Sequence, residues 1–366
     1  MRHAEVTYRL TSVDASDIDA LASDLLLEQT FETPREVVSK YVELTDRAGE
    51  VHDIRPSENG AVDITLHLPD DDIQNVAQLV NRVFGNVSIH PNIRLIDFVP
   101  SRGLAQRFEG PKFGAEGIRE AFGYPRRPLT CTALKPVGLS TDQLAELCRT
   151  FAQSGIDIIK DDHYLADQPT APFEERITRC AEVAADVSAR QGRPIWYVPS
   201  ISGSPDEVRR RCEAAGDAGL KAVMLAPMTT GLPVLHSVRR ETDLAILTHP
   251  SFSPVASIAP KVLWSTLFRM LGADAVIFVN AGGRFDYSVE ECRTVAATMM
   301  APIFDLKASL PVPAGGIALD EVPRTIQRYG NDSALLVGGS LLKQEDLGEA
   351  TRRFVEAVAE NALLAE

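Results

Sequence analysis

The stretch Gly155-Ile156-Asp157-Ile158-Ile159-Lys160-Asp161-Asp162-His163 decides the fold class of this 366-residue chain. An apolar run follows a glycine and ends in four ionisable residues, which predicts a buried strand with polar chemistry at its C-terminal end. Buried strands of this kind are typical of parallel sheets whose two faces are covered. A buried lysine beside carboxylates is costly unless the charges pair or bind a metal, so the segment is an ion cluster or part of a site.

Units of a strand followed by a helix repeat through the rest of the chain. The predicted strands are Leu129–Leu134, Ile156–Lys160, Ile195–Pro199, Ala222–Leu225, Ala245–Thr248, Ala275–Val279, Leu310–Pro313 and Ala334–Val337. The helices predicted among and after them include Thr141–Ser154, Glu174–Ala189, Pro205–Gly216, Lys261–Leu271, Val289–Phe304, Glu321–Tyr329 and Leu347–Ala362. Eight such units in roughly 240 residues predict a (β/α)8 TIM barrel. A doubly wound open sheet is the alternative, but no dinucleotide-binding fingerprint follows a strand.

The N-terminal segment has a different order of elements. Alternating apolar residues predict strands at Glu5–Thr11, Tyr41–Thr45, Ala61–Leu68 and Ile93–Val99. Helical spacing predicts helices at Asp17–Leu27, after Ser16 as its N-cap, and at Asp72–Phe84. This order predicts a ferredoxin-like α+β domain over 1–115 and a barrel domain over 116–366.

The composition argues against several classes of protein. The net charge is −14 and the pI is near 5.0, without the clustered Lys and Arg that nucleic-acid binding requires. The N-terminus has no apolar signal core, and no stretch approaches the ~20 apolar residues of a membrane span. The cysteines are scattered and form no C-x-x-C pair, so we expect neither disulfides nor a zinc ribbon. This pattern predicts a protein of the reducing cytoplasm. The cysteines are Cys131, Cys148, Cys180, Cys212 and Cys292.

Two glycine pairs follow neighbouring strands of the predicted barrel. Gly315-Gly316 comes after the seventh strand and Gly338-Gly339 after the eighth. The loops after these strands often form a phosphate cradle, because glycine lets backbone N–H groups approach an anion closely. The other interpretation is that these glycines serve tight turns.

Two lysines follow the first and second predicted strands. Lys135 and Lys160 are both predicted to point into the barrel mouth, where neighbouring ammonium groups depress each other's pKa and favour a general base. Lys160 could instead accept a carboxyl group and, with Asp162, suit a hard cation such as Mg2+. An ordinary Lys–Asp ion pair is the alternative. His249, after the fifth strand, is a catalytic group or a hydrogen-bonded rim histidine.

These residues carry a resemblance to the large-subunit superfamily of ribulose-bisphosphate carboxylase (RuBisCO). The segments that resemble this family are Thr132–Ser140, Gly155–Asp162, Leu310–Gly316 and Leu336–Gly339 in the barrel and Glu28, Thr30 and Gly85–Val87 in the N-terminal domain. The resemblance covers nearly the whole chain in order. It implies an N-terminal α+β domain, a C-terminal barrel and a homodimer without a small subunit, in which Glu28 and Asn86 complete the partner's active site.

The resemblance also implies roles for single residues. Lys135 resembles the family's proton-transferring lysine, Lys160 the lysine that is carbamylated to bind Mg2+, and His249 the histidine that moves protons. Asp162 resembles a second metal ligand, and His163 stands at the position of the third. The resemblance implies a phosphate and substrate site formed by Ala314, Gly315, Gly316, Gly338, Gly339, Asn280 and Thr132.

Several positions depart from the carboxylases. His163 replaces a glutamate ligand, although Mg2+ prefers oxygen ligands. Pro250 and Asn280 replace an arginine and a histidine that hold a second phosphate. The loop Asn280–Asp286 is short and lacks the lysine that stabilises the carboxylated intermediate, with Arg284 the only cation nearby. The resemblance therefore implies a RuBisCO-like protein of form IV, in its non-photosynthetic branch, with a singly phosphorylated substrate.

After these departures, the residues that resemble the family's base, metal site and one phosphate site are still present. Together they favour enolisation over carbon fixation. The leading hypothesis is an isomerase of a phosphorylated ketose such as 5-methylthioribulose 1-phosphate, with Lys135 as base and Mg2+ on Lys160 and Asp162. The second hypothesis is a decarboxylase, or a transcarboxylase/hydrolase, of a 3-oxo sugar-acid phosphate. The third is a non-catalytic metabolite-binding protein, motivated by His163, Pro250 and Asn280. Deuterium exchange with solvent favours the isomerase, and CO2 release favours the decarboxylase.

Overall fold

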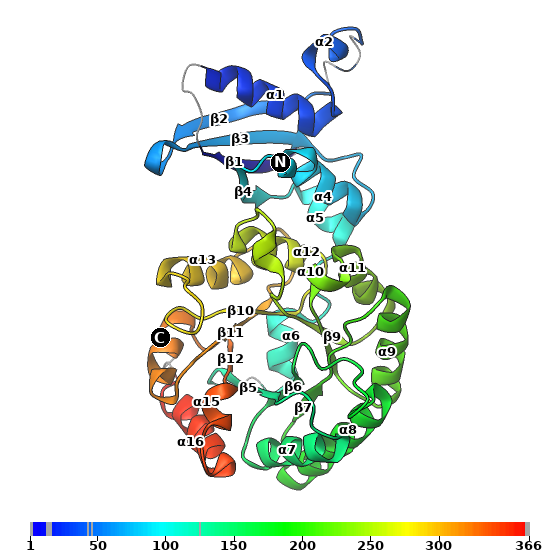
Figure 1. Cartoon of the computed structure of the whole chain (residues 1–366), viewed down its shortest axis with the longest axis vertical. Coiled ribbons are helices and arrows are strands. Elements are labelled where there is room, and N and C mark those ends of the chain that lie inside the picture. Colours follow the sequence, from blue (N-terminus) through cyan, green and yellow to red (C-terminus); the bar gives the residue numbers. More distant parts are fainter. Residues whose placement is uncertain (1–2, 12–16, 42–43, 45–46, 124–125, 363–366) are drawn as a thin grey trace.

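The computed structural model describes residues 3–11, 17–41, 44, 47–123 and 126–362. Its N-terminal part is a four-stranded sheet with helices, and its C-terminal part consists of parallel strands with helices around them (Figure 1). Within the described part of the chain, no helix combines the length and the apolar character needed to cross a membrane.

The N-terminal sheet is antiparallel, with the strand order β2-β3-β1-β4. Its elements in chain order are β1 (His3–Leu10), α1 (Ile18–Phe31), α2 (Arg35–Val38), β2 (Glu50–Pro56), β3 (Val62–Pro69), α4 (Val76–Phe84), η3 (Asn86–Ile89) and β4 (Ile93–Val99). Alternate residues of β1 are buried, and the Tyr8 hydroxyl donates to the Val83 carbonyl at 2.6 Å, which ties the sheet to α4. The order of strands and helices is that of the predicted ferredoxin-like unit.

The second strand lies later in the chain than the sequence indicated. Of the predicted strand Tyr41–Thr45, the structure describes only Tyr41 and Leu44, and neither is in a strand. The strand is β2, whose register with β3 shifts between Val51 and Asp53. This bulge breaks the alternation on which the prediction depends, because it inserts one extra residue. The predicted N-cap Ser16 lies outside the described residues.

The C-terminal part confirms all eight predicted strands. They form two parallel sheets, β12-β5-β6-β7 and β11-β10-β9-β8. The bounds are β5 (Leu129–Leu134), β6 (Ile158–Asp161), β7 (Trp196–Val198), β8 (Ala222–Leu225), β9 (Ala245–Thr248), β10 (Ala275–Val279), β11 (Leu310–Ala314) and β12 (Ala334–Leu336). The two sheets are joined where the Ile201 amide donates to the Met224 carbonyl and the Met224 amide to the Pro199 carbonyl, both at 2.8 Å. Closure into a complete barrel stays a prediction.

Helices follow these strands and cover the outside of the sheets (Figure 1). They are α7 (Thr141–Gln153), α8 (Phe173–Gln191), α9 (Pro205–Asp217), α10 (Pro227–Thr230), α11 (Leu232–Glu241), α13 (Val289–Met300), α14 (Val322–Tyr329), α15 (Gly339–Leu342) and α16 (Leu347–Glu360). The segment predicted as one helix from Lys261 to Leu271 is a π-helix, η5 (Lys261–Leu267), that continues as α12 (Phe268–Met270). Capping boxes at Ser140, Ser204 and Ser288 define the starts of three helices.

A short helix connects the two parts of the chain. After α5 (Arg102–Phe108), helix α6 (Gly114–Ala121) places Ala115 and Ile118 in the inner apolar cluster formed by the parallel strands. The buried Asp274 carboxylate, just before β10, accepts hydrogen bonds from the amides of Phe113 and Gly114 at 2.7 and 2.8 Å. It thereby ties the start of α6 to the sheet. The predicted division at residue 115 falls within α6.

Candidate active site

The end of β6 separates two kinds of ionisable side chain. Side chains alternate along a strand, so Lys160 and Asp162 lie on one side and Asp161 on the other. Lys160 is only 3% exposed, and its Nζ donates to the Asp161 carbonyl at 2.8 Å. Asp161 is fully buried, and its carboxylate accepts from the Tyr197 hydroxyl at 2.8 Å and the Arg176 guanidinium at 3.2 Å. Asp161 therefore supports the strand end, while Lys160 and Asp162 remain for chemistry.

Lys135, directly after β5, forms an ion pair with Asp162. β5 and β6 are hydrogen-bonded neighbours, which brings the residues after them together. The Asp162 carboxylate also accepts the Tyr164 amide at 3.0 Å and lies 3.5 Å from His163 Nδ1. Burial on its own would raise the pKa of Asp162, but the hydrogen bonds from Lys135 and Tyr164 and the charge of Lys160 bring it below its usual value. Asp162 is therefore a carboxylate anion at neutral pH.

His163 and His249 stack face to face. Their ring centroids are 4.0 Å apart and their planes are inclined by 8°. The Ser251 amide donates to His249 Nδ1 at 3.1 Å, so the neutral ring carries its proton on Nε2. Burial, with the charges of Lys160 and Lys135 nearby, lowers the pKa of His249 well below its usual value, and burial also lowers that of His163. Both rings are therefore neutral at pH 7; His249 presents its Nε2–H as a donor, and His163 could offer a nitrogen to a proton or a metal.

The surroundings of Lys160 fit carbamylation. Burial lowers the pKa of this lysine, although the charge interactions with Cys131 and Asp162 raise it. A lower pKa increases the fraction of neutral amine, which is the form that reacts with CO2. The carbamate would be an anionic oxygen donor beside the Asp162 carboxylate, and hard cations such as Mg2+ prefer such ligands. Lys160, Asp162 and His163 are thus the residues that could hold a metal.

The glycines after β11 form a constrained turn. Gly315 and Gly316 have φ angles of +98° and +110°, which side chains rarely adopt. A Cβ atom on Gly316 would come within 2.9 Å of the Arg284 amide nitrogen, so this turn packs directly on the loop after β10. The Ser340 hydroxyl donates to the Ile317 carbonyl at 2.7 Å and joins this turn to the loop after β12.

The second glycine pair remains open. Added Cβ atoms at Gly338 and Gly339 would meet nothing within 4 Å. Since β12 is hydrogen-bonded to β5, this pair follows the strand next to the one that ends at Lys135. The two predicted glycine loops are therefore joined to each other, and the one that follows β12 comes after the neighbour of the Lys135 strand and has space over its glycines. Ala314, the last residue of β11, accepts the Asn280 amide at 2.7 Å.

Two predicted substrate contacts make other hydrogen bonds. The buried Asn280 side-chain oxygen accepts from Arg328 Nη1 and from the Tyr329 hydroxyl, each at 3.1 Å, so α14 positions it. The Thr132 hydroxyl donates to the Val337 carbonyl at 2.8 Å. Because its neighbour Cys131 belongs to the inner cluster, Thr132 lies on the opposite face of β5 and joins this strand to β12.

Glu28 and Asn86 come together on the N-terminal domain. The Asn86 side-chain amide donates to Glu28 Oε1 at 2.8 Å, across α1 and the start of η3. Among the described residues, no hydrogen bond or ion pair joins them to Lys135, Lys160 or Asp162 of the same chain. The structure therefore brings this predicted pair together but not to the strand ends of its own chain.

Sequence reasoning missed Arg176 as a supporting residue. Its fully buried guanidinium binds Asp161 and also donates to the carbonyls of Leu165, Ala166 and Ala171, at 3.3, 2.7 and 2.6 Å. It thereby fixes the loop that carries Asp162 and His163. An arginine near the start of a predicted amphipathic helix gives no sequence signal of this role.

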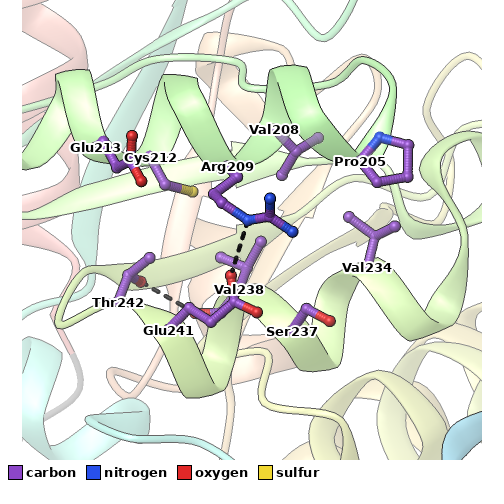
Figure 2. A pocket seen from close by; sticks show the side chains of 10 residues that line it. All are labelled: Pro205, Val208, Arg209, Cys212, Glu213, Val234, Ser237, Val238, Glu241 and Thr242. Atoms are coloured by element: carbon purple, nitrogen blue, oxygen red, sulfur yellow. Dashed lines mark hydrogen bonds and ion pairs between the residues drawn. The ribbon is translucent and has the colours of Figure 1, made fainter.

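Two further observations concern the rest of the barrel. The cavity drawn in Figure 2 lies between α9 and α11, is lined by Val208, Cys212 and Val238 and is crossed by the Arg209–Glu241 ion pair at 3.6 Å, so it is separate from the strand ends. All five cysteines are buried and free, as the sequence predicted.

Comparison with known proteins agrees with this geometry. Residues 114–361 match the family model described as the ribulose bisphosphate carboxylase large chain, catalytic domain. The chain is 41% identical over 357 residues to ribulose bisphosphate carboxylase-like protein 1 of Rhodopseudomonas palustris, covering 97% of each. It is also 41% identical over 357 residues to the 5-methylthioribulose-1-phosphate isomerase of Rhodospirillum rubrum, covering 96% of this chain and 95% of that protein.

The structural comparison extends over the entire chain. The crystal structure of a Rubisco-like protein from Rhodopseudomonas palustris matches with a TM-score of 0.91 and 36% sequence identity, covering 100% of both chains. The family model matches well over half of the sequence, and the relatives span both parts of the fold. The chain therefore belongs to the ribulose bisphosphate carboxylase large-chain family, in its RuBisCO-like branch.

Proposed function

We propose that this protein isomerises a singly phosphorylated ketose of the 5-methylthioribulose 1-phosphate type and does not fix carbon. The observation that carries the proposal is the cluster of Lys135, Asp162 and Lys160 at the ends of two neighbouring strands. The similarity to an isomerase along nearly the whole chain supports the same reaction class. The loop after β10 supplies Arg284 but no lysine, which argues against stabilisation of a carboxylated intermediate.

The strand order suggests how the substrate lies. The glycine pair after β12 adjoins Lys135 after β5, which adjoins Lys160 and Asp162 after β6. A phosphate held by backbone N–H groups at the glycine pairs would therefore place the first sugar carbons beside Lys135. The substrate carbonyl would then lie toward the end of β6.

Proton transfer is the chemistry that these residues can supply. A base removes the proton from the carbon next to the carbonyl, the electron pair forms an enediolate, and the proton returns to a different carbon. Lys135 forms an ion pair with Asp162, and a lysine can accept a proton only as the neutral amine, so Lys135 has to leave this pair before it acts as the base. Neutral His249, with its proton on Nε2, is suited to donate a hydrogen bond to the enediolate oxygen while Lys135 returns the proton to the other carbon.

Mg2+ bound to carbamylated Lys160 and Asp162 would stabilise negative charge on the enediolate oxygens. His163 offers a nitrogen at the third position, and the first two ligands supply the oxygens that Mg2+ favours. We also infer that the eight strands close into a barrel, which is supported by the direct join between β7 and β8. The free cysteines support a cytoplasmic location.

We further infer a homodimer with shared sites. Glu28 and Asn86 are paired with each other, yet among the described residues neither makes a hydrogen bond or ion pair with the strand ends of its own chain. Tyr164 and Phe252, on the loops after β6 and β9, are 71% and 59% exposed. Exposed aromatic side chains beside a polar site are compatible with a surface that a second subunit covers.

The test is a comparison of three substrates with the full-length protein, Mg2+ and bicarbonate. Phosphorus and proton NMR should show conversion of 5-methylthioribulose 1-phosphate to an isomer of equal mass and no product from ribulose 1,5-bisphosphate. Release of CO2 from a branched 3-oxo sugar-acid phosphate, without isomerisation, would contradict the proposal and favour the decarboxylase. Absence of turnover with all three would favour the non-catalytic binding protein.

A further inference from the structure

A polar cavity lies where the N-terminal sheet meets the barrel, outside the site described above. Its volume is about 340 Å3, and its walls include Arg94 of β4, Ser253 and Ser257 of the loop after β9, Trp264 of η5 and Tyr287 of the loop after β10. The two parts of the chain thus enclose it together, and the two barrel loops that border it also border the candidate active site.

Two buried polar atoms in the wall of this cavity have no partner within the described protein. Ser253 Oγ and Trp264 Nε1 make no hydrogen bond there, although the two residues are only 3% and 2% exposed. The indole N–H can only donate, and leaving a buried donor unsatisfied is unfavourable. Both residues belong to the wall of the same cavity, so an acceptor bound there is within reach of the two donors once their side chains adjust.

Arg94 supplies positive charge to the same space. Its position is fixed because the Leu95 amide donates to the Ser257 carbonyl at 3.0 Å and the Ala259 amide to the Leu95 carbonyl at 2.8 Å. The strand register places Arg94 directly opposite Arg9, whose guanidinium already binds Asp63 at 2.7 and 2.8 Å. Like charges in this arrangement destabilise a sheet. Arg94 thus adds no favourable pair to the sheet, and no ion pair of its side chain occurs among the described residues.

The wall of the cavity is rigid. Trp264 and Tyr287 pack against each other with centroids 5.9 Å apart, and the Ser257 hydroxyl donates to the Ile93 carbonyl at 2.9 Å. We propose that this cavity binds a small oxyanion of the phosphate class, with Arg94 as counter-charge and Trp264 Nε1 and Ser253 Oγ as hydrogen-bond donors. This site is separate from the glycine loops and does not depend on the proposed isomerase activity.

The chain offers an internal reporter for this site. It contains two tryptophans, Trp196 and Trp264, so a Trp196→Phe variant leaves the cavity residue as the sole indole fluorophore. The experiment titrates inorganic phosphate into this full-length variant and measures tryptophan fluorescence, with sodium chloride at equal ionic strength as the blank. We expect a saturable change with phosphate and none with chloride.

Variants of the cavity distinguish this site from other phosphate sites. Arg94→Gln and Ser253→Ala, each added to Trp196→Phe, should raise the phosphate Kd, by at least about tenfold for the arginine, because a charge-assisted hydrogen bond contributes more than 1.4 kcal/mol. Arg55→Gln on β2 is the matched control, because Arg55 is exposed and pairs with Asp53, and it should leave the Kd unchanged.

Three results would overturn the proposal. The first is the absence of a saturable fluorescence response to phosphate, and the second is a phosphate Kd that Arg94→Gln does not change. The third is loss of the response in Gly316→Ala, which would show that the fluorescence senses phosphate at the glycine loops. The first two would mean that the cavity holds only water.

Discussion

Lys135 and Asp162 form an ion pair that has to open if Lys135 is to accept a proton. This contact gives Asp162 a second role beside the proposed metal ligation, because the carboxylate holds the lysine that is the proposed base. Asp162→Asn removes the anion but keeps an oxygen that can accept the Tyr164 amide. The single substitution therefore tests both roles without removing the side chain.

We expect Asp162→Asn to lower kcat by at least about 100-fold, since base and metal platform both depend on the carboxylate. Activation by Mg2+ should disappear as well, which a merely structural role would not explain. The measurement is initial rate against Mg2+ concentration. Asp142→Asn, at an exposed position on α7, is the control and should retain full activity. Retention of Mg2+ activation in Asp162→Asn would contradict the assignment.

Gly316 tests the phosphate loop at the same scale. Alanine there would be strained at a φ of +110°, and its Cβ would press on the Arg284 amide nitrogen. We expect KM for the phosphorylated substrate to rise about tenfold, because a turn that shifts to relieve this strain no longer holds its backbone N–H groups in place for the phosphate. Gly216→Ala, in helix α9 with nothing within 4 Å, is the matched control. An unchanged KM would argue that phosphate binds elsewhere.

At the residue scale, ionisable residues at the ends of buried strands are the signal that worked. They indicated that Lys135 and Lys160 lie together at the strand ends, and the structure places Lys160 and Asp162 beside Lys135. The alternation of side chains along β5 would have placed Thr132 on the outer face, where its hydroxyl binds Val337. The support from Arg176 could not be predicted, because it depends on carbonyl groups whose need for partners appears only in the folded loop.

At the scale of elements, helix α8 and strand β6 are joined by one buried charge pair. Replacing Arg176 with methionine would leave the Asp161 carboxylate buried without its counter-charge, which costs about 3–5 kcal/mol. We expect a decrease of that size in the free energy of unfolding, measured with urea. Arg179→Met, one helical turn later and 53% exposed, should change it by less than about 0.5 kcal/mol. Equal effects of the two substitutions would contradict this interpretation.

The elements that the sequence predicted best are those whose pattern of apolar residues is uninterrupted. Buried parallel strands such as β8 and β9 are short apolar runs, and their predicted bounds match the structure. β2 escaped prediction because its bulge interrupts the alternation. The π-helical turns of η5 were also missed, because π and α turns bury similar apolar residues and differ only in their backbone hydrogen bonds.

At the scale of the whole molecule, the proposed shared site makes a quantitative prediction. Glu28→Gln and Lys135→Ala should each inactivate a homodimer. Glu28→Gln alters the active site of the partner subunit, and Lys135→Ala alters the active site of its own subunit. Mixing and refolding the two variants in equal amounts should restore about one quarter of wild-type activity, because half of the dimers are hybrids and one of their two sites is intact. Activity that stays at the level of the separate variants would contradict a shared site.

The two-part architecture was predictable because the order of the predicted elements changes along the sequence. The N-terminal part has alternating strands with few helices, and the rest has regular strand–helix units. The arrangement of the two parts was not predictable in the same way. Contacts such as the Lys261–Asp97 ion pair at 2.8 Å and the buried Asp274 join residues far apart in the chain. Neither contact leaves a periodic signal, so only the folded structure reveals them.

The central claim is that this chain enolises a phosphorylated ketose with Lys135 as the base. The most direct test is proton NMR of 5-methylthioribulose 1-phosphate in D2O with Mg2+ and bicarbonate, using the wild type, Lys135→Ala and, as a control, Lys221→Ala, an exposed lysine that precedes β8. We predict that solvent deuterium enters substrate or product with the wild type and Lys221→Ala but not with Lys135→Ala. Absence of deuterium uptake in the wild type, or its persistence in Lys135→Ala, would contradict it.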